Sequence, residues 1–106
     1  MITKQKNRYV LVEASAPIDT SDRAVSSELV EAIIDEIGAL EYASAFPKVM
    51  SQLGDRSFVL RVNRGHESTI ILALSFVKSV QGREMGFYTI KTSGTIRKLV
   101  SFFKDE

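Results

Sequence analysis

The chain has 106 residues, which suits one compact domain and is too short for two. Its hydrophobic content of 44% and charged content of 25% are close to globular averages, so we expect a packed core. With no cysteine and one histidine, it has no means to form disulfides, cysteine nucleophiles or an ordinary zinc site. No apolar run reaches the roughly 18–20 residues that cross a bilayer. The N-terminus also lacks a signal-peptide core, so we expect a cytoplasmic protein without membrane contact.

The formal net charge of +1 conceals an uneven distribution. Residues 1–53 contain five Lys or Arg against eight Asp or Glu, a net of −3. Residues 54–106 contain nine against five, a net of +4. An acidic first half and a basic second half are compatible with a protein partner on one side and RNA on the other.

The first half of the chain predicts a strand, a helix and a weak second strand. Apolar and polar side chains alternate over residues 8–16, as in a strand. Pro17 and the polar residues after it end the strand and supply N-caps for a helix that reaches about Ile37, with apolar residues every four positions. Gly38 is a natural stop, and residues 39–45 are either a short helical turn or irregular. Pro47 favours an edge position, or a strand start, for the weak strand over residues 46–53.

The second half predicts a clear strand from Ser57 to Asn63, with Phe58, Leu60 and Val62 on one face. Gly65 ends it, and a second helix is expected over residues 66–80. A turn at residues 81–83 leads into a last strand at about residues 84–92. Ser93 is then expected to cap a short C-terminal helix.

The order of these elements predicts an α+β fold made of one domain over residues 1–106. It is a ferredoxin-like, RRM-like βαββαβ sandwich with a four-stranded antiparallel sheet and an extra C-terminal helix. Many RNA-binding modules share this arrangement. Unrelated proteins share it too, so the fold alone does not define a function.

The second helix is apolar around well over half of its circumference. A helix that lies on a sheet buries one face, so Leu72 and Phe76 need a second cover. We expect the C-terminal helix to supply it, and a partner chain is the alternative.

The segment Ser93-Gly94-Thr95-Ile96-Arg97-Lys98 is a candidate phosphate contact. With Ser93 at the N-cap, the first backbone N–H groups of the helix would point outward and attract an anion. Arg97 and Lys98 fall in the first turn, where cations are mildly unfavourable unless an anion binds. Arg97 would then chelate a phosphate while Thr95 donates its hydroxyl. The alternative is that Arg97 pairs with an acidic residue or lies in solvent.

Arg61 and Arg64 form a second candidate group. Arg61 points away from the apolar face of its strand, and Arg64 follows at the strand end. We expect Arg61 to share an open sheet face with Lys91 or Lys48, which would bind phosphates in a salt-dependent way. Scattered, solvated charges are the alternative.

No group of residues indicates an active site. His66 has no nucleophile or carboxylate at a recognisable spacing, and the first helix carries its carboxylates with the periodicity of a solvated face. The segment Ala16-Pro17-Ile18 lacks the phosphate-cradling loop that ferredoxin-like acylphosphatases have after their first strand. The strand at residues 58–63 also lacks the aromatic signature of common RNA-recognition domains. Any RNA would therefore be recognised by its phosphates and shape.

Four stretches resemble the family of archaeal ribonuclease P protein component 2, which has a eukaryotic counterpart. They are Arg8-Tyr9-Val10-Leu11-Val12, Leu60-Arg61-Val62-Asn63-Arg64, Ala73-Leu74 and Ser93-Gly94-Thr95-Ile96-Arg97-Lys98. Their order and spacing extend from about residue 8 to residue 100, and the last stretch is the most specific. The compact length is similar to that of archaeal members, whereas the net charge is low for an RNA-bound subunit.

The resemblance implies a non-catalytic RNA-binding subunit of a hydrolase, the endoribonuclease that removes the 5′ leader from precursor tRNA. The RNA subunit would carry the catalytic Mg²⁺, so no cofactor, metal site or catalytic residue is expected on this chain. The implied partners are ribonuclease P RNA, precursor tRNA through the complex, and the TIM-barrel-like protein component 3 in a dimer of heterodimers. The expected phosphate contacts are Arg61, Arg64, Lys91, Ser93, Thr95, Arg97 and Lys98, and the candidate protein contacts are Leu72, Phe76, Glu28 and Glu31.

Two other hypotheses remain open. One is a ferredoxin-like protein-interaction or regulatory module that binds no RNA. The other is a small phosphate-handling enzyme, which would turn over an acyl phosphate without a partner.

Overall fold

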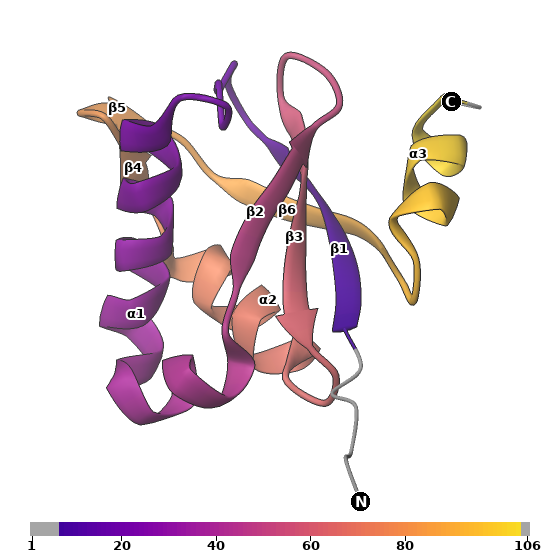
Figure 1. Ribbon diagram of the computed structural model, residues 1–106. Coiled ribbons are helices and arrows are strands. Elements are labelled where there is room, and N and C mark those ends of the chain that lie inside the picture. Colours follow the sequence, from indigo (N-terminus) through magenta and orange to yellow (C-terminus); the bar gives the residue numbers. More distant parts are fainter. Residues whose placement is uncertain (1–6, 105–106) are drawn as a thin grey trace, which may run out of the picture.

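The computed structural model describes residues 7–104. In chain order the elements are β1 (Asn7–Ala14), α1 (Arg23–Ala45), β2 (Lys48–Gln52), β3 (Ser57–Asn63), α2 (Glu67–Phe76), β4 (Ser79–Val80), β5 (Arg83–Glu84), β6 (Phe87–Ser93) and α3 (Ile96–Lys104) (Figure 1). The main sheet has the order β2-β3-β1-β6, and every neighbouring pair is antiparallel. This order confirms the predicted ferredoxin-like βαββαβ fold. Within the described residues, no helix combines the length and hydropathy of a bilayer-spanning segment.

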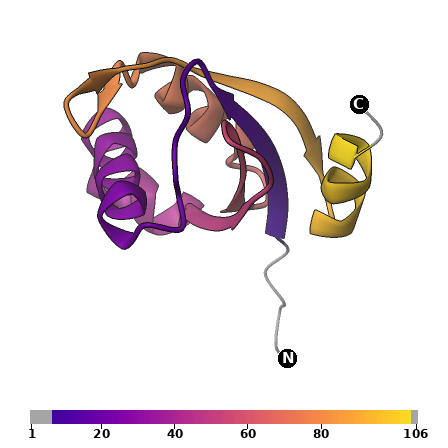
Figure 2. The same cartoon turned by 90° about the horizontal axis from the view of Figure 1, so that it is seen from above.

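The two faces of the sheet are covered by different helices. On one face, α1 and α2 enclose the main core, whose fully buried side chains include Val10, Val12, Leu29, Ile33, Phe58, Leu60, Val62 and Ile70. On the other face, α3 buries Leu99 against Leu11 and Val59. Figure 2 shows α1 and α2 on one side of β1 and α3 alone on the other. The described chain therefore has three layers.

The expected cover of α2 by the C-terminal helix is wrong. Leu72 and Phe76 remain 59% and 53% exposed on α2. The reason is that the second sheet face has an apolar strip of its own at Leu11 and Val59, and α3 packs on this strip. Because β6 runs directly into α3 from the edge of the sheet, the helix reaches that strip through a short turn.

The predicted boundary at Gly38 is confirmed. Its φ of 83° and ψ of 164° lie outside the helical region, and they kink α1 before a last helical stretch that ends at Ala45. At the other end, the carboxylate of Asp22 caps α1 by accepting the Ala24 N–H at 2.9 Å. Pro47 is followed by β2, which lies at the edge of the sheet as predicted.

The second helix is shorter than predicted, and the last strand begins later. α2 ends at Phe76, and residues 79–84 form a small hairpin of β4 and β5. Gln81 and Gly82 turn this hairpin with φ values of 54° and 73°, a pair of left-handed residues suited to a two-residue hairpin loop. Val80 in β4 and Met85 directly after β5 are both buried. The hairpin, with these two residues in the core, therefore stands where the last turn of the helix was predicted.

Replacing Leu99 with alanine tests the packing of α3. Leu99 is fully buried, so its truncation would leave a cavity and reduce the free energy of unfolding by about 2–5 kcal/mol. Urea unfolding measures this change. Ser101→Ala, at an exposed position of the same helix, is the control and should change stability by less than about 0.5 kcal/mol. Equal stability of the two variants would contradict the packing of α3 on the sheet.

Candidate nucleic-acid interface

Antiparallel pairing brings the start of β1 together with the ends of β3 and β6. Asn7 lies opposite Asn63 on β3, and Tyr9 lies opposite Ser93 on β6. Arg64 follows β3, and the first turn of α3 follows β6 after a two-residue connection. We call this region the basic end of the sheet, defined by Arg8, Lys48, Arg61, Arg64, Arg97 and Lys98.

Arg61 lies in one cross-strand row with Lys48 and Tyr9. Both residues are its direct partners, on β2 and β1, so the three side chains leave the same face of the sheet. Lys91 lies opposite Leu11, in the next row of that face. The predicted shared face of Arg61, Lys48 and Lys91 is therefore confirmed.

That face is not fully open, contrary to expectation. α3 covers its Leu11–Val59 strip, and Lys91 Nζ lies 5.0 Å from the ring centroid of Phe102 on this helix. This cation–π contact holds the ammonium group over the ring while Lys91 remains exposed. The cations of the face therefore lie around the margin of α3.

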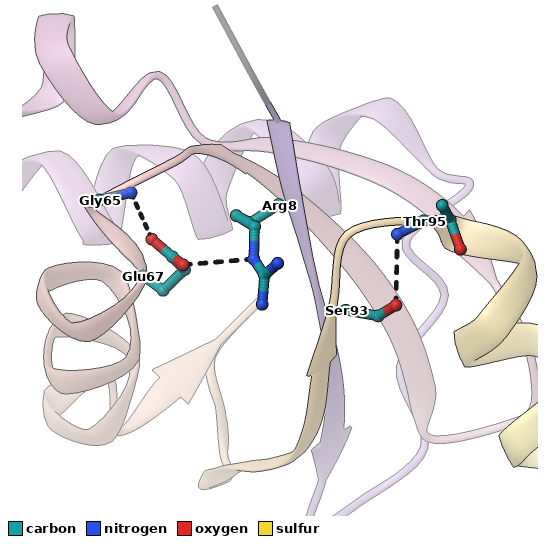
Figure 3. Close-up of polar contacts among 5 residues, drawn as sticks. All are labelled: Arg8, Gly65, Glu67, Ser93 and Thr95. Carbon is teal, nitrogen blue, oxygen red and sulfur yellow. Dashed lines mark hydrogen bonds and ion pairs between the residues drawn. The ribbon is translucent and has the colours of Figure 1, made fainter.

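Thr95, and not Ser93, caps α3. The helix begins at Ile96, and Thr95 Oγ1 accepts the Lys98 N–H at 3.3 Å. Ser93 is the buried last residue of β6, and its hydroxyl accepts the Thr95 N–H at 3.2 Å (Figure 3). The placement of Arg97 and Lys98 in the first turn is as predicted, and both are exposed. Burial of Ser93 leaves Thr95, Arg97 and Lys98 as the accessible ones among the phosphate contacts predicted in this motif.

The predicted phosphate-contacting cations have no acidic partners in the described part of the chain. The ion pairs between residues 7 and 104 join Arg8 to Glu67 and His66 to Glu41. Among residues 7–104, Arg97 thus has no acidic partner and lies exposed to solvent, which leaves open the alternative of a solvated side chain. Arg64, Lys91, Arg97 and Lys98 are exposed, and Arg61 is half-buried.

Arg8 is a cation at this end that the sequence analysis did not include among the site residues. Its Nε lies 3.3 Å from Glu67 Oε2, while Glu67 Oε1 accepts the Gly65 N–H at 2.6 Å (Figure 3). A signal for Arg8 was present in the sequence. It has the same strand parity as the buried Val10 and Val12, and a charged side chain at an inward-facing position requires a partner.

The environment of Glu67 favours its charged form. Burial raises the pKa of this carboxyl. Backbone N–H groups, including those of Glu67 and Gly65, and the Arg8 guanidinium lower the pKa by more than burial raises it. The net result is a pKa below the ordinary value of 4.5. Glu67 therefore remains an anion that orients Arg8.

The candidate protein contacts are of two kinds. Leu72 and Phe76 are exposed on α2, and Leu40 on α1 is 89% exposed. Glu28, in contrast, accepts the backbone N–H of Gln81 at 2.7 Å and its side-chain amide at 2.6 Å. The Glu28 carboxylate thus fixes the β4–β5 hairpin to α1, whereas Glu31 is exposed.

Carboxylates and His66 do not gather into a metal centre in the part of the chain that the structure describes. No group of three or more potential His, Cys, Asp or Glu ligands occurs between residues 7 and 104.

The fold and these surfaces define an α+β protein of the ferredoxin-like class with exposed cations around one end of its sheet. Comparison with known families assigns it further. The sequence model of the Rpp14/Pop5 family matches residues 8–104, and the chain belongs to this family.

Archaeal relatives named ribonuclease P protein component 2 are similar over most of the chain. The protein of Methanocorpusculum labreanum is 28% identical over 96 residues, which cover 91% of this chain and 65% of the relative. That of Thermococcus gammatolerans is 29% identical over 108 residues, with coverages of 97% and 87%. That of Methanosphaerula palustris is 33% identical over 100 residues, with coverages of 89% and 59%. The chain thus spans less than two thirds of two of these relatives.

A solved structure with the same fold is also found. A chain in the cryo-EM structure of yeast ribonuclease MRP superposes with a TM-score of 0.66, covering 99% of this chain and 96% of that one. At 12% identity, the likeness shows the shared fold alone.

Replacing Glu67 with glutamine tests its coupling to Arg8 as a function of pH. A lowered folded-state pKa stabilises the fold above the unfolded-state pKa, and this stabilisation is lost as the pH falls through the folded-state pKa. The wild type should therefore be more stable than Glu67→Gln at pH 7. This difference in stability should become smaller once the pH falls below 4.5, the ordinary pKa of a glutamate. Urea unfolding at pH 7 and at pH 3 measures the difference. Glu84→Gln, at an exposed position, is the control. A comparable pH-dependent loss of stability in this variant would contradict the coupling of Glu67 to Arg8.

Proposed function

We propose that this chain is a non-catalytic, RNA-binding protein subunit of ribonuclease P that supports RNA-catalysed removal of the 5′ leader from precursor tRNA. The observation that carries the proposal is family membership over residues 8–104. Three relatives bear the name of a ribonuclease P protein component, which agrees with it.

Cations that have no acidic partner among residues 7–104 support RNA binding. The row of Lys48 and Arg61 on the sheet and the first turn of α3 present positive charge at the same end. Arginine chelates phosphate in a fork geometry, and each neutralised phosphate releases counterions. A modest net charge of +1 is sufficient because these cations are concentrated at one end.

The environments of the shifted carboxyls support a non-catalytic role. Hydrogen bonds from the Ser21 hydroxyl and N–H lower the pKa of Asp19, and the pKa of Glu67 is also lowered. A carboxyl that acts as a general acid at neutral pH needs a raised pKa, so neither Asp19 nor Glu67 fits that role. In this proposal the Mg²⁺ ions belong to the RNA subunit, and this chain binds and orients RNA.

Leu72, Phe76 and Leu40 support a protein partner. Large apolar side chains this exposed are typical of contact surfaces, and the hollow between α1 and α2 that includes Leu72 and Phe76 measures about 300 Å³. We assign this surface to protein component 3, within a dimer of heterodimers. The same surface favours the rival hypothesis, a protein-interaction module that binds no RNA.

Filter binding of ribonuclease P RNA over a series of KCl concentrations separates the two hypotheses. The measurement is made with the full chain, alone and with component 3. RNA binding through phosphates should weaken steeply with salt, by a slope of about −0.7 to −0.9 per phosphate in a log–log plot. Binding that is absent at low salt, or indifferent to salt, would contradict the RNA-binding proposal and favour the protein-interaction module.

The double substitution Arg97→Ala with Lys98→Ala should weaken RNA binding and reduce the salt slope by about two, one for each lost contact. Both side chains are exposed and lack ion pairs among the described residues, so thermal stability should be nearly unchanged. The matched control is Lys78→Ala with Arg83→Ala, which removes the same charge at the distant β4–β5 hairpin. Equal weakening by both double variants would indicate binding by diffuse charge.

A further inference from the structure

A hollow of about 360 Å³ lies at the basic end of the sheet, lined by Asn7, Arg8, Tyr9, Arg64 and Gly94. The part of this lining that the structure describes contains two arginines and no acidic residue. We propose that this hollow binds one phosphodiester group of the RNA backbone, held by Arg8 and Arg64. The inference rests on the proposed RNA-binding function and defines a specific site within it.

Arg8 is held so that its outer edge is free for a ligand. Its Nε is buried and lies 3.3 Å from Glu67 Oε2, and this nitrogen makes no hydrogen bond to the described residues. The ion pair therefore contacts the inner edge of the guanidinium. Neither terminal nitrogen faces Glu67 in Figure 3: one points toward the connection between β6 and α3, and the other points downward in the view. Two terminal N–H groups side by side match two oxygens of a phosphate.

Gly94 keeps the space beside this guanidinium open. A Cβ atom built at Gly94 would lie 3.5 Å from Arg8 Nη1 and within 4 Å of no other neighbouring group. The φ of Gly94 is not positive, unlike those of Gly38, Gly65 and Gly82. The backbone conformation therefore does not require glycine here. A larger side chain would instead occupy the room that a phosphate needs beside Arg8.

Glu67 positions both arginines of the hollow. One of its oxygens accepts the N–H of Gly65, which turns the chain directly after Arg64 with a φ of 95°. The other oxygen pairs with Arg8. A single carboxylate thus fixes the turn that carries Arg64 and the side chain of Arg8. The hollow keeps a net positive charge, because one anion faces two cations.

The connection to the surrounding surface supports RNA as the source of the phosphate. Tyr9 lines the hollow and is also the direct cross-strand partner of Arg61. Tyr9 therefore borders both the hollow and the row of Lys48 and Arg61, which would meet neighbouring phosphates of the same strand.

The test uses filter binding of ribonuclease P RNA to the full chain at several KCl concentrations. Arg8→Gln and Arg64→Gln should each weaken binding by about tenfold, as for a lost charge-assisted hydrogen bond, and reduce the salt slope by about one. Because both arginines hold the same phosphate, the double variant should also lose only about one unit of slope. Arg56→Gln, which removes an exposed arginine at the other end of β3, is the matched control and should retain nearly wild-type binding.

Gly94→Val is the decisive variant because it retains every charge. If the hollow is a built site, valine should exclude the phosphate and weaken binding by about tenfold with a loss of about one unit of slope. Thermal unfolding confirms that each variant is folded. If Arg8→Gln fails to fold, Arg64→Gln and Gly94→Val still decide the question.

The outcomes separate this proposal from the function on which it rests. If the wild type binds RNA with a steep salt dependence and Gly94→Val binds equally well, the hollow is not a phosphate site and the proposed function stands. If the wild type shows no salt-dependent binding, the proposed function itself fails.

A short oligoribonucleotide with and without a 5′ phosphate identifies the source of the phosphate. Equal affinity, lost equally in Gly94→Val, supports an internal phosphodiester. A preference for the 5′-phosphorylated form that Gly94→Val abolishes would overturn that assignment in favour of a terminal phosphate.

Discussion

The pairing of β1 with both β3 and β6 is the constraint on which the rest of the structure depends. Because strand side chains alternate between faces, Val10 and Val12 enter the main core while Tyr9 and Leu11 face α3. A shift of one residue in this register would exchange the two sets. The same register aligns Tyr9 with Arg61 and Ser93, so that three segments distant in sequence form the basic end.

The sequence predicts the elements with strong local signals and fails where distant packing decides. The alternating pattern of residues 57–63 identifies β3 with its correct bounds, and Gly38 interrupts α1 as predicted. The apolar run that begins at Ile70 contains no helix breaker before Gly82, so local pattern alone extends α2 too far. The amphipathic pattern of α3 predicts that it has a buried face, and only the fold shows that Leu11 and Val59 cover it.

In the candidate site, too, local sequence signals predict some features and distant packing decides the others. Strand alternation places Arg61 on the outer face, but its neighbours Lys48 and Tyr9 follow from the pairing register. Ser93 and Thr95 are both suitable N-caps, and the length of β6 decides between them by burying Ser93 as its last residue. Arg8 was missed because its partner Glu67 belongs to a distant helix, which the fold alone brings beside it.

The uneven charge of the sequence becomes a division between layers in three dimensions. The acidic side chains of the first half lie largely on α1, in the same layer as the exposed Leu72 and Phe76 of α2. The cations Lys48, Arg61 and Lys91 lie on the opposite face of the sheet, around α3. Apart from Arg8, which pairs with Glu67 on α2, the sheet cations proposed for RNA therefore lie on the face opposite the surface proposed for protein. An RNA on these cations and a protein on α2 would thus contact different parts of the chain, and like-charge repulsion would disfavour RNA on the acidic helix.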